Sequence, residues 1–460
     1  MLIVLSDLHF ADTSPYTMGI NRSNLNLPGR VYRTFFREIA ELIKEGQVEH
    51  IDLILAGDIF EITRSVMWHN DHLRPYVHND EVTEGTPHEQ RILDILDAIA
   101  TDPKVADTAK VFRSLEDLFG MPVKIHYIPG NHDRLANTTP KIRNKIREFF
   151  GIEESDDYFS NQYLHYRDGE ARILIRHGHE YDQSNFGTNL SLWPEIPTVI
   201  DKSYYDMPVL GDIVTVEIAS KLPLLFREQY GDEAILSDSN LRRMYQRLID
   251  FDNVRPNNAM INFLFSTPGI NRKEIWKIIE PVLRNLLDEI AKNNTLADDI
   301  MALGNFKKLS AKAIMSIFKM RIWRRGLPLW MFNGLTNPVM RKTGHDADIT
   351  LLNKESFLTE GNVHLRCLVS GHTHNATVRL LSVEDGVEKY YINSGTFRNV
   401  ITTTPGQNKF GRLRSKARIL IYEEGEQNPE YRRETGWSFD FNARLGFGDD
   451  AENLIDSLGD

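Results

Sequence analysis

The chain has 460 residues, a formal net charge of −11 and a hydrophobic fraction of 41%. This length allows one large core or two to three domains, and the composition is that of an ordinary globular protein. One cysteine excludes an internal disulfide, no apolar run is long enough to span a bilayer, and the acidic balance disfavours nucleic acid except at a local basic patch.

The first predicted elements are strands that end in polar residues. The run LIVL at 2–5 precedes Asp7 and His9, and IDLILAGD at 51–58 ends in Asp58. Residues 31–45 carry apolar side chains at helical spacing, which predicts an amphipathic helix. The start of the chain lacks the basic segment and long apolar run of a signal peptide, so we expect a cytoplasmic protein.

The same pattern recurs further along the chain. Helices are predicted at 89–101 and 108–119, and the strand VKIHYIP leads into GNHD, which contains Asn131 and His132. Two later apolar runs end in histidine motifs, ARILIRHGH and LRCLVSGHTH. Further strands are expected around 389–393 and 417–422. Open α/β sheets place their sites beyond the carboxyl ends of strands, so this arrangement favours a functional edge.

One long segment interrupts the pattern of strands and helices. Residues 186–345 read as helices and loops with several prolines, which indicates an inserted helical cap or lid. We therefore expect a core in two parts, 1–185 and 346–460, with an acidic tail at its end.

The side chains at the strand ends share one chemistry, since they are carboxylates, imidazoles and one amide. They are Asp7, His9, Asp58, Asn131, His132, His177, His372 and His374. Turns do not require so many imidazoles, whereas a divalent metal site does. Seven of them as ligands are too many for one tetrahedral centre, but seven suit two metals that share a bridging carboxylate.

The motifs SDLH, GDIFE, GNHD, HGH and GHTH, in this order, resemble those of the calcineurin-like metallophosphoesterase superfamily. The resemblance covers about 1–182 and 346–400. It implies an α/β fold, a four-layer α/β/β/α sandwich with two metals at one edge, here with the large helical insertion added.

The resemblance also implies a role for each motif residue. It assigns one metal to Asp7, His9 and His374, the other to Asn131, His177 and His372, and places Asp58 between them. His132 corresponds to the family's catalytic imidazole. The family usually orients that imidazole with an aspartate, and this chain has the longer Glu61 there. His179, the second histidine of HGH, is a candidate substrate contact.

These roles predict a phosphate-ester hydrolase, most simply a phosphodiesterase or pyrophosphohydrolase. A metal-bridging hydroxide would attack phosphorus while His132 protonates the leaving oxygen. Manganese is the first expectation for the two divalent ions, with iron, zinc or nickel as alternatives. The alternative functions are a DNA-repair-type nuclease and, in another class, a metal-organised binding scaffold without turnover.

Several basic residues are candidates for anion recognition. Arg64, Arg134 and Arg176 lie beside the motifs, where each can bind a phosphate oxygen or form a structural ion pair. The stretch 306–342 has nine lysines and arginines among aromatic residues and no acidic residue. It suits a lid over an amphiphilic phosphate ester, a membrane-surface patch, a nucleic-acid groove or a packed helix. The sequence leaves the substrate and the oligomeric state open.

Overall fold

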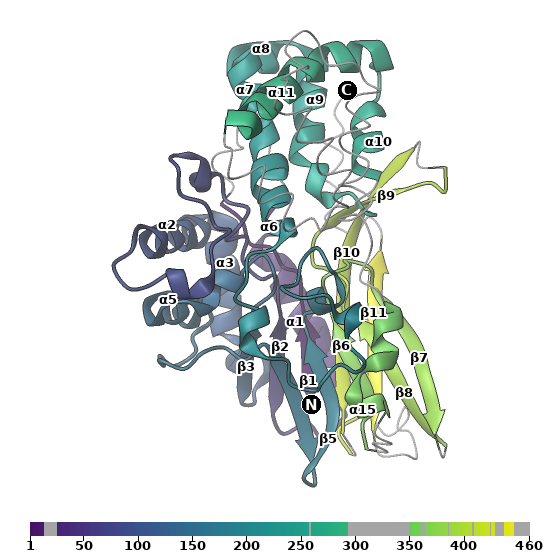
Figure 1. Ribbon diagram of the computed structural model, residues 1–460. Coiled ribbons are helices and arrows are strands. Elements are labelled where there is room, and N and C mark those ends of the chain that lie inside the picture. Colours follow the sequence, from purple (N-terminus) through teal and green to yellow (C-terminus); the bar gives the residue numbers. More distant parts are fainter. Residues whose placement is uncertain are drawn as a thin grey trace.

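The computed structural model shows a mixed α/β fold with two β-sheets (Figure 1). It describes residues 1–12, 25–256, 259–292, 349–359, 364–384, 386–406, 409–423, 425–427 and 437–445. The stretch 306–342 and the acidic tail lie outside the described residues, so the expectations for them stay predictions.

The first sheet contains the strands that precede Asp7, Asp58 and Asn131. Its strand order is β11-β10-β1-β2-β3, and β9 pairs with β10. Strands β1, β2 and β3 run parallel, which brings their carboxyl ends to one edge. The strands of this sheet are β1 (Leu2–Leu5), β2 (Ile51–Ala56), β3 (Val123–Ile128), β9 (Asn399–Thr403), β10 (Phe410–Tyr422) and β11 (Ser438–Leu445).

The second sheet contains the strands that precede the two histidine motifs. Its order is β4-β5-β6-β8-β7, with β5, β6 and β8 parallel. The strands are β4 (Gln162–Arg167), β5 (Glu170–Arg176), β6 (Cys367–Ser370), β7 (Thr377–Glu384) and β8 (Val387–Asn393). Apolar side chains from both sheets, such as Val4, Ile54, Ile175 and Val369, form one buried cluster between them.

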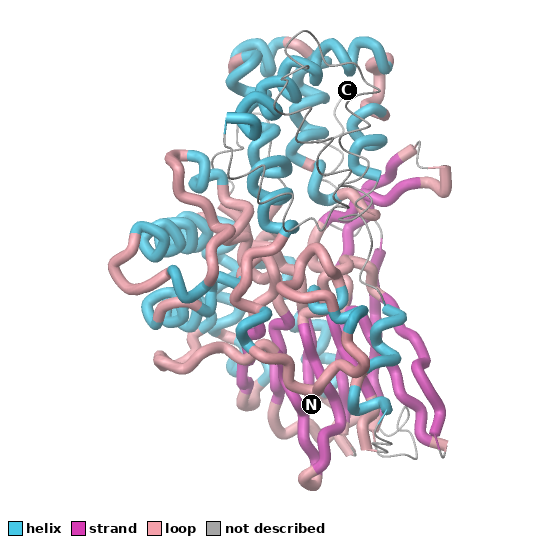
Figure 2. Tube along the Cα trace, in the orientation of Figure 1, coloured by secondary structure: helices cyan, strands magenta, loops and turns pink. Residues whose placement is uncertain are grey.

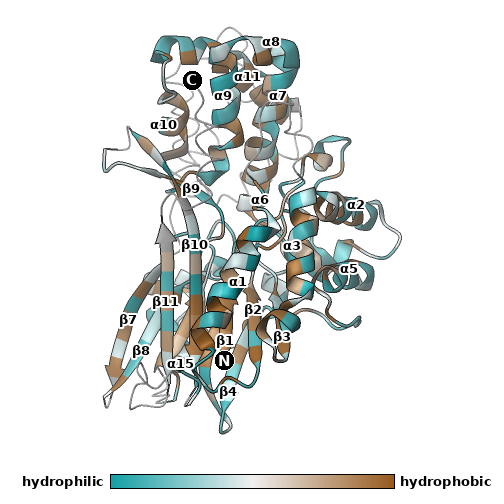
Figure 3. Cartoon of the chain, turned by 180° about the vertical axis from the view of Figure 1, so that it is seen from behind, coloured by the Kyte–Doolittle hydropathy of each residue, from teal (hydrophilic) through white to brown (hydrophobic). Residues whose placement is uncertain are grey.

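Helices cover the outer face of the first sheet. Figure 3 shows hydrophobic stretches in β1 and β2, and their outward side chains pack against Val31, Phe35 and Ile39 on one face of α1. The helices of this layer are α1 (Gly29–Ile43), α2 (Pro87–Thr101), α3 (Pro103–Arg113), α4 (Leu115–Phe119) and α5 (Pro140–Phe150). Prolines in the first turns of α2, α3 and α5 fit their starts, since that position needs no backbone donor.

The outer face of the second sheet is covered differently. Leu174, Leu368 and Tyr391 pack against loops and short helices, among them the 3₁₀ helix Leu190–Leu192 and α15 (Ser356–Thr359). The part of 186–345 before Leu210 therefore packs on the second sheet, and α-helices appear only from there on. The other short helices are η2 (Val66–His69), η3 (Asn79–Glu81), η4 (Arg134–Asn137), η5 (His179–Tyr181), η7 (Lys202–Tyr204), η9 (Phe251–Asn253) and η12 (Ile349–Lys354).

The described helices of the expected insertion form a bundle around a buried apolar cluster, to which Ala11, Leu25 and Val66 from the first part of the chain also belong. Figure 2 shows these helices gathered at the end of the sandwich opposite the amino terminus. Phe226, Tyr245, Leu248 and Ile279 belong to their buried apolar cluster. The helices are α6 (Leu210–Val214), the π-helical segment η8 (Thr215–Ser220), α7 (Lys221–Tyr230), α8 (Asp232–Ser237), α9 (Ser239–Ile249), α10 (Met260–Phe265) and α11 (Arg272–Lys292). Among the described helices, none is both long and apolar enough to cross a membrane.

Candidate metal centre

The loops after β1, β2, β5 and β6 meet at one edge of the two sheets. Their polar side chains lie on unusual backbone, because five of them have positive φ without being glycine. These are Asp7 (53°), His9 (49°), Asp58 (54°), His372 (68°) and His374 (58°). Positive φ strains an ordinary residue, and such strain gathers at functional sites.

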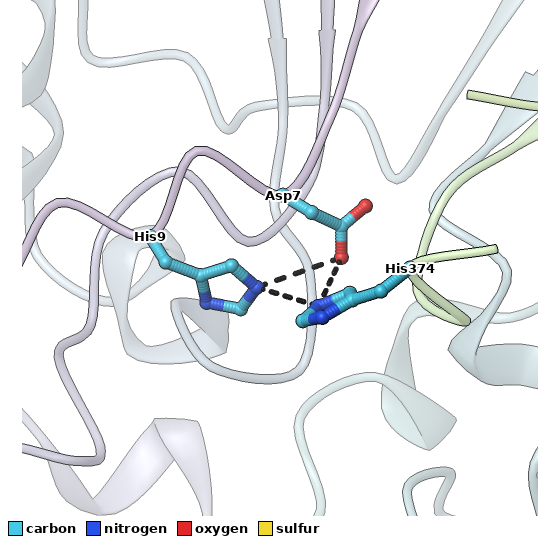
Figure 4. Close-up of side chains that lie close together, drawn as sticks. All are labelled: Asp7, His9 and His374. Atoms are coloured by element: carbon cyan, nitrogen blue, oxygen red, sulfur yellow. Dashed lines mark hydrogen bonds and ion pairs between the residues drawn. The ribbon is translucent and has the colours of Figure 1, made fainter. Parts of the chain in front are cut away.

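One group of converging side chains consists of Asp7, His9 and His374 (Figure 4). The Nε2 atoms of the two imidazoles lie 2.9 Å apart, and Asp7 Oδ1 lies 3.2 Å from His374 Nε2 and 3.6 Å from His9 Nε2. All three residues are buried, and Asp7 Oδ1 accepts no hydrogen bond from the described chain. Two imidazole nitrogens and a carboxylate oxygen facing one point fit a divalent cation.

A second group lies beside the first. Asp58, His177 and His372 present ligand atoms within 4.8 Å of one another. Asn131 joins them, since its Oδ1 lies 3.3 Å from His177 Nε2 and 3.0 Å from His372 Nδ1. The Nδ1–H of His177 donates to the backbone carbonyl of Ala56 at 2.8 Å, so the neutral form of His177, the form that binds a metal, would present the lone pair of Nε2 to the site. These residues fit a second cation.

Asp58 lies at the centre of the site. Its Oδ2 is 3.1 Å from His177 Nε2, and its Oδ1 accepts the backbone N–H of His132 at 2.8 Å. Burial acts to raise the pKa of this carboxyl, but the charges of His177 and His132 outweigh burial and hold the pKa well below its ordinary value. Asp58 is therefore anionic, which suits a candidate metal ligand.

Glu61 connects His132 to His9. Its Oε2 lies 2.8 Å from His132 Nδ1, while its Oε1 lies 3.0 Å from His9 Nδ1 and accepts from Arg398 Nη1 at 2.7 Å. Burial acts to lower the pKa of His132, yet the charges of Glu61 and Asp58 raise it to about 10. The two oxygens of Glu61 therefore contact both imidazoles.

Asp133 fixes the loop that carries Asn131 and His132. Its carboxylate accepts hydrogen bonds from the backbone N–H groups of Gly130 (2.5 Å) and Ile59 (2.8 Å) and from the Tyr127 hydroxyl (2.5 Å). Gly130 lies so close to Asp58 that a Cβ there would be 2.3 Å from Asp58 Oδ1. Any larger residue would displace the central carboxylate.

Sequence reasoning missed two groups at this site. Asp182 lies 3.1 Å from the Nε2 of His372, and Arg398 binds Glu61. Asp182 follows HGH in the same loop, so its proximity to that motif was an available signal. Arg398 comes from a distant loop that carries no ligand.

The four candidate substrate contacts lie in different surroundings. Arg64 Nη1 is 3.5 Å from Glu61 Oε1 and 3.2 Å from Asp252 of the insertion, which places Arg64 beside the site. His179 is buried beside His177, and burial lowers its pKa to about 4.

The other two arginines are buried in ion pairs. Arg134 pairs with Asp212 at 3.1 Å, and Arg176 pairs with Glu355 at 2.7 Å. Arg176 also donates to the backbone carbonyls of Pro197 and Thr198. These contacts give both guanidinium groups a structural role, so we propose no substrate contact for them.

Comparison with known proteins agrees with the geometry of the site. The family model for calcineurin-like phosphoesterases matches residues 1–376. The chain belongs to the calcineurin-like phosphoesterase family. It is accordingly a phosphoester hydrolase, and the α/β fold class and the family resemblance predicted from the sequence are confirmed. The family and the two clusters support a binuclear site for divalent metal ions in this phosphoesterase.

No curated protein matches this phosphoesterase. Among solved structures, it is similar to a dimetal phosphatase from Danio rerio, with 12% identity and a TM-score of 0.25. That similarity covers 91% of this chain and 94% of the other.

Proposed function

We propose that this phosphoesterase is a two-metal phosphodiesterase or pyrophosphohydrolase in which His132 is the general acid. The observation that carries the proposal is the meeting of two ligand groups around Asp58, next to the His132–Glu61 pair. Asp7, His9 and His374 would hold one ion, and Asn131, His177 and His372 the other, with Asp58 shared. The mixture of nitrogen and oxygen ligands suits Mn²⁺, and we propose that metal first.

In the proposed hydrolysis, the metal ions would activate the water, and His132, Glu61 and Arg398 would act on the leaving group. Two bound ions would polarise the phosphoryl group and lower the pKa of a water molecule. His132 holds a proton on each ring nitrogen in its charged form; Nδ1 is bound to Glu61, so Nε2 is the nitrogen that can protonate the leaving oxygen. Glu61 then stabilises the orientation of the ring, and Arg398 holds Glu61.

Cys367, the only cysteine, is buried and unpaired, which fits a reducing environment. We propose the cytoplasm on this ground.

The acid role of His132 can be tested with two substrates. His132→Asn should keep both metals and lose about 10²–10⁴-fold in turnover of an alkyl phosphodiester, because the leaving alkoxide then departs without a proton. A nitrophenyl ester, whose leaving group is stable without a proton, should lose much less. Equal losses on both substrates, with metal content unchanged, would argue against the acid role. Absence of turnover by the metal-loaded parent on both esters would favour a binding scaffold.

A further inference from the structure

A cavity lies between the two sheets at the edge opposite the metal centre. Its volume is about 180 Å³, and its walls include Met1 and Leu2 at the start of β1 and Ile173 in β5. Figure 1 places the amino terminus at the end of the sandwich far from the insertion, whereas the candidate ligands follow the other ends of these strands. The cavity is therefore separate from the proposed active site.

Two arginines line this cavity, and neither has an acidic partner among the residues that the structure describes. Arg172 from β5 and Arg366, just before β6, both line it. Within the described chain, no carboxylate is within ion-pair distance of either guanidinium, and the buried Nε of Arg172 has no hydrogen-bond partner. The two residues are neighbours on adjacent chain segments, since the backbone N–H of Arg366 donates to the Arg172 carbonyl at 2.8 Å. Burial and the positive charge of Arg172 both lower the pKa of Arg366.

The wall of the cavity contains two acidic residues, Asp168 and Glu423, and both lie beside Arg167. Glu423 lies 2.5 Å from His165 Nε2 and 3.6 Å from Arg167 Nη1. Asp168 Oδ2 lies 3.8 Å from Arg167 Nε, so Arg167 is a partner of both carboxylates. Arg172 and Arg366 are the two arginines of the wall for which the described chain provides no acidic partner. Like charges are held together at a cost, which an anion between them would remove.

The size of the cavity limits its ligand. Pockets for drug-sized molecules start at about 300 Å³, so this one suits a smaller ligand. Two guanidinium groups offer planar pairs of N–H donors that match the oxygens of a tetrahedral oxyanion.

We propose that this cavity is a second anion site, which binds a small tetrahedral oxyanion of the size of inorganic phosphate between Arg172 and Arg366. The site is independent of the proposed catalysis, because it shares no residue with the metal centre.

The test is calorimetric titration of inorganic phosphate into the full-length, metal-loaded protein at constant ionic strength. Three variants are compared with the parent: Arg172→Gln/Arg366→Gln in the cavity, Asp58→Asn in the metal centre, and Lys124→Gln/Lys141→Gln, two exposed cations on β3 and α5, as a matched loss of charge. We expect the cavity variant to weaken one phase of phosphate binding by at least about tenfold, and we expect Asp58→Asn and the lysine variant to retain that phase. A cavity variant that binds like the parent, or loss of all binding in Asp58→Asn, would overturn the proposal.

Hydrogen exchange of the unmodified protein gives a readout that does not depend on how the variants fold. Phosphate should slow amide exchange in residues 165–173 and 364–368, which surround the two arginines. Protection confined to the loops after β1, β2 and β6 would locate phosphate at the metal centre alone and contradict a second site.

Discussion

Glu61 contacts two different histidines of the candidate site, His9 and His132. Its two oxygens reach His9 in one ligand group and His132 beside the other, and Arg398 stabilises its charge. A side chain shorter by one methylene group would not span both imidazoles from the same backbone position. The side-chain length of Glu61 therefore allows it to contact both imidazoles at once.

We expect the substitution Glu61→Asp to lower turnover about 10–100-fold, because the shorter carboxylate loses contact with one of the two histidines that Glu61 orients. Glu41→Gln, at an exposed pair with Lys44, is the control and should leave turnover unchanged. Steady-state rates with metal content measured in parallel check this. Full activity of Glu61→Asp would mean that one histidine contact is dispensable.

At the residue scale, the sequence predicted the side chains that lie in short motifs at strand ends. Asp7, Asp58 and His177 directly follow apolar runs, so both the strand and the ligand are visible in one stretch of sequence. Asp182 and Arg398 could not be assigned in this way, because each acts through a contact made only by the folded chain.

At the element scale, the helical insertion is attached to the core by buried polar contacts. Arg134 of η4 reaches Asp212 of α6, and it also donates to Asn79 Oδ1 at 2.7 Å and to the Pro75 carbonyl at 2.9 Å. The guanidinium is thus shared between the core and the insertion. Loss of its acidic partner would leave a buried charge without compensation.

We therefore predict that Asp212→Ala lowers the free energy of unfolding by about 3 kcal/mol. Asp232→Ala, which removes the acidic partner of Arg227 in an exposed pair, should cost less than about 1 kcal/mol. Chemical denaturation of both variants checks the difference. Equal effects would mean that the Arg134–Asp212 pair does not anchor the insertion.

A second contact between core and insertion responds to pH. His69 Nε2–H donates to Ser220 Oγ at 2.9 Å, since that hydroxyl itself donates to Val216. Burial lowers the pKa of His69 to about 4; the nearby Glu217 acts to raise it, while Lys221 and Arg74 act to lower it. The imidazole is neutral in the folded protein.

This pKa sets the direction of a pH effect on stability. Between pH 6.5 and 4 the unfolded chain binds a proton at His69 that the folded chain does not, so stability falls as the pH falls through this window. We expect a contribution of up to about 3 kcal/mol, absent in His69→Gln. Urea unfolding of both proteins at pH 7 and pH 4.5 measures it. Parallel losses in the two proteins would contradict the assignment.

Some helices and strands were easier to predict from the sequence than others. Strands β1, β2 and β6 are fully or almost fully buried, and their continuous apolar runs were visible in the sequence. Strand β4 was missed because its residues are only partly buried and mix polar with apolar types. The covering of the second sheet by residues before Leu210 was also missed, since short 3₁₀ helices have no clear periodicity.

At the scale of the whole molecule, all candidate ligands lie outside 186–345, on loops of the two sheets. The insertion nevertheless reaches the site, because Asp252 pairs with Arg64, and the N–H of Arg255 donates to the Ile401 carbonyl at 2.8 Å. We therefore propose that the core builds the metal centre and that the insertion borders it. We infer that the insertion influences substrate choice rather than metal binding.

The most direct test of the account is the metal stoichiometry of the full-length protein and of Asp58→Asn. Elemental analysis of the Mn²⁺-loaded parent should show two equivalents per chain, and electron paramagnetic resonance should show two coupled ions, since Asp58 is proposed to bridge them. Asp58→Asn should lose the coupling and bind at least one ion more weakly. One equivalent in the parent at saturating metal, with binding unchanged in Asp58→Asn, would contradict a bridged two-metal centre.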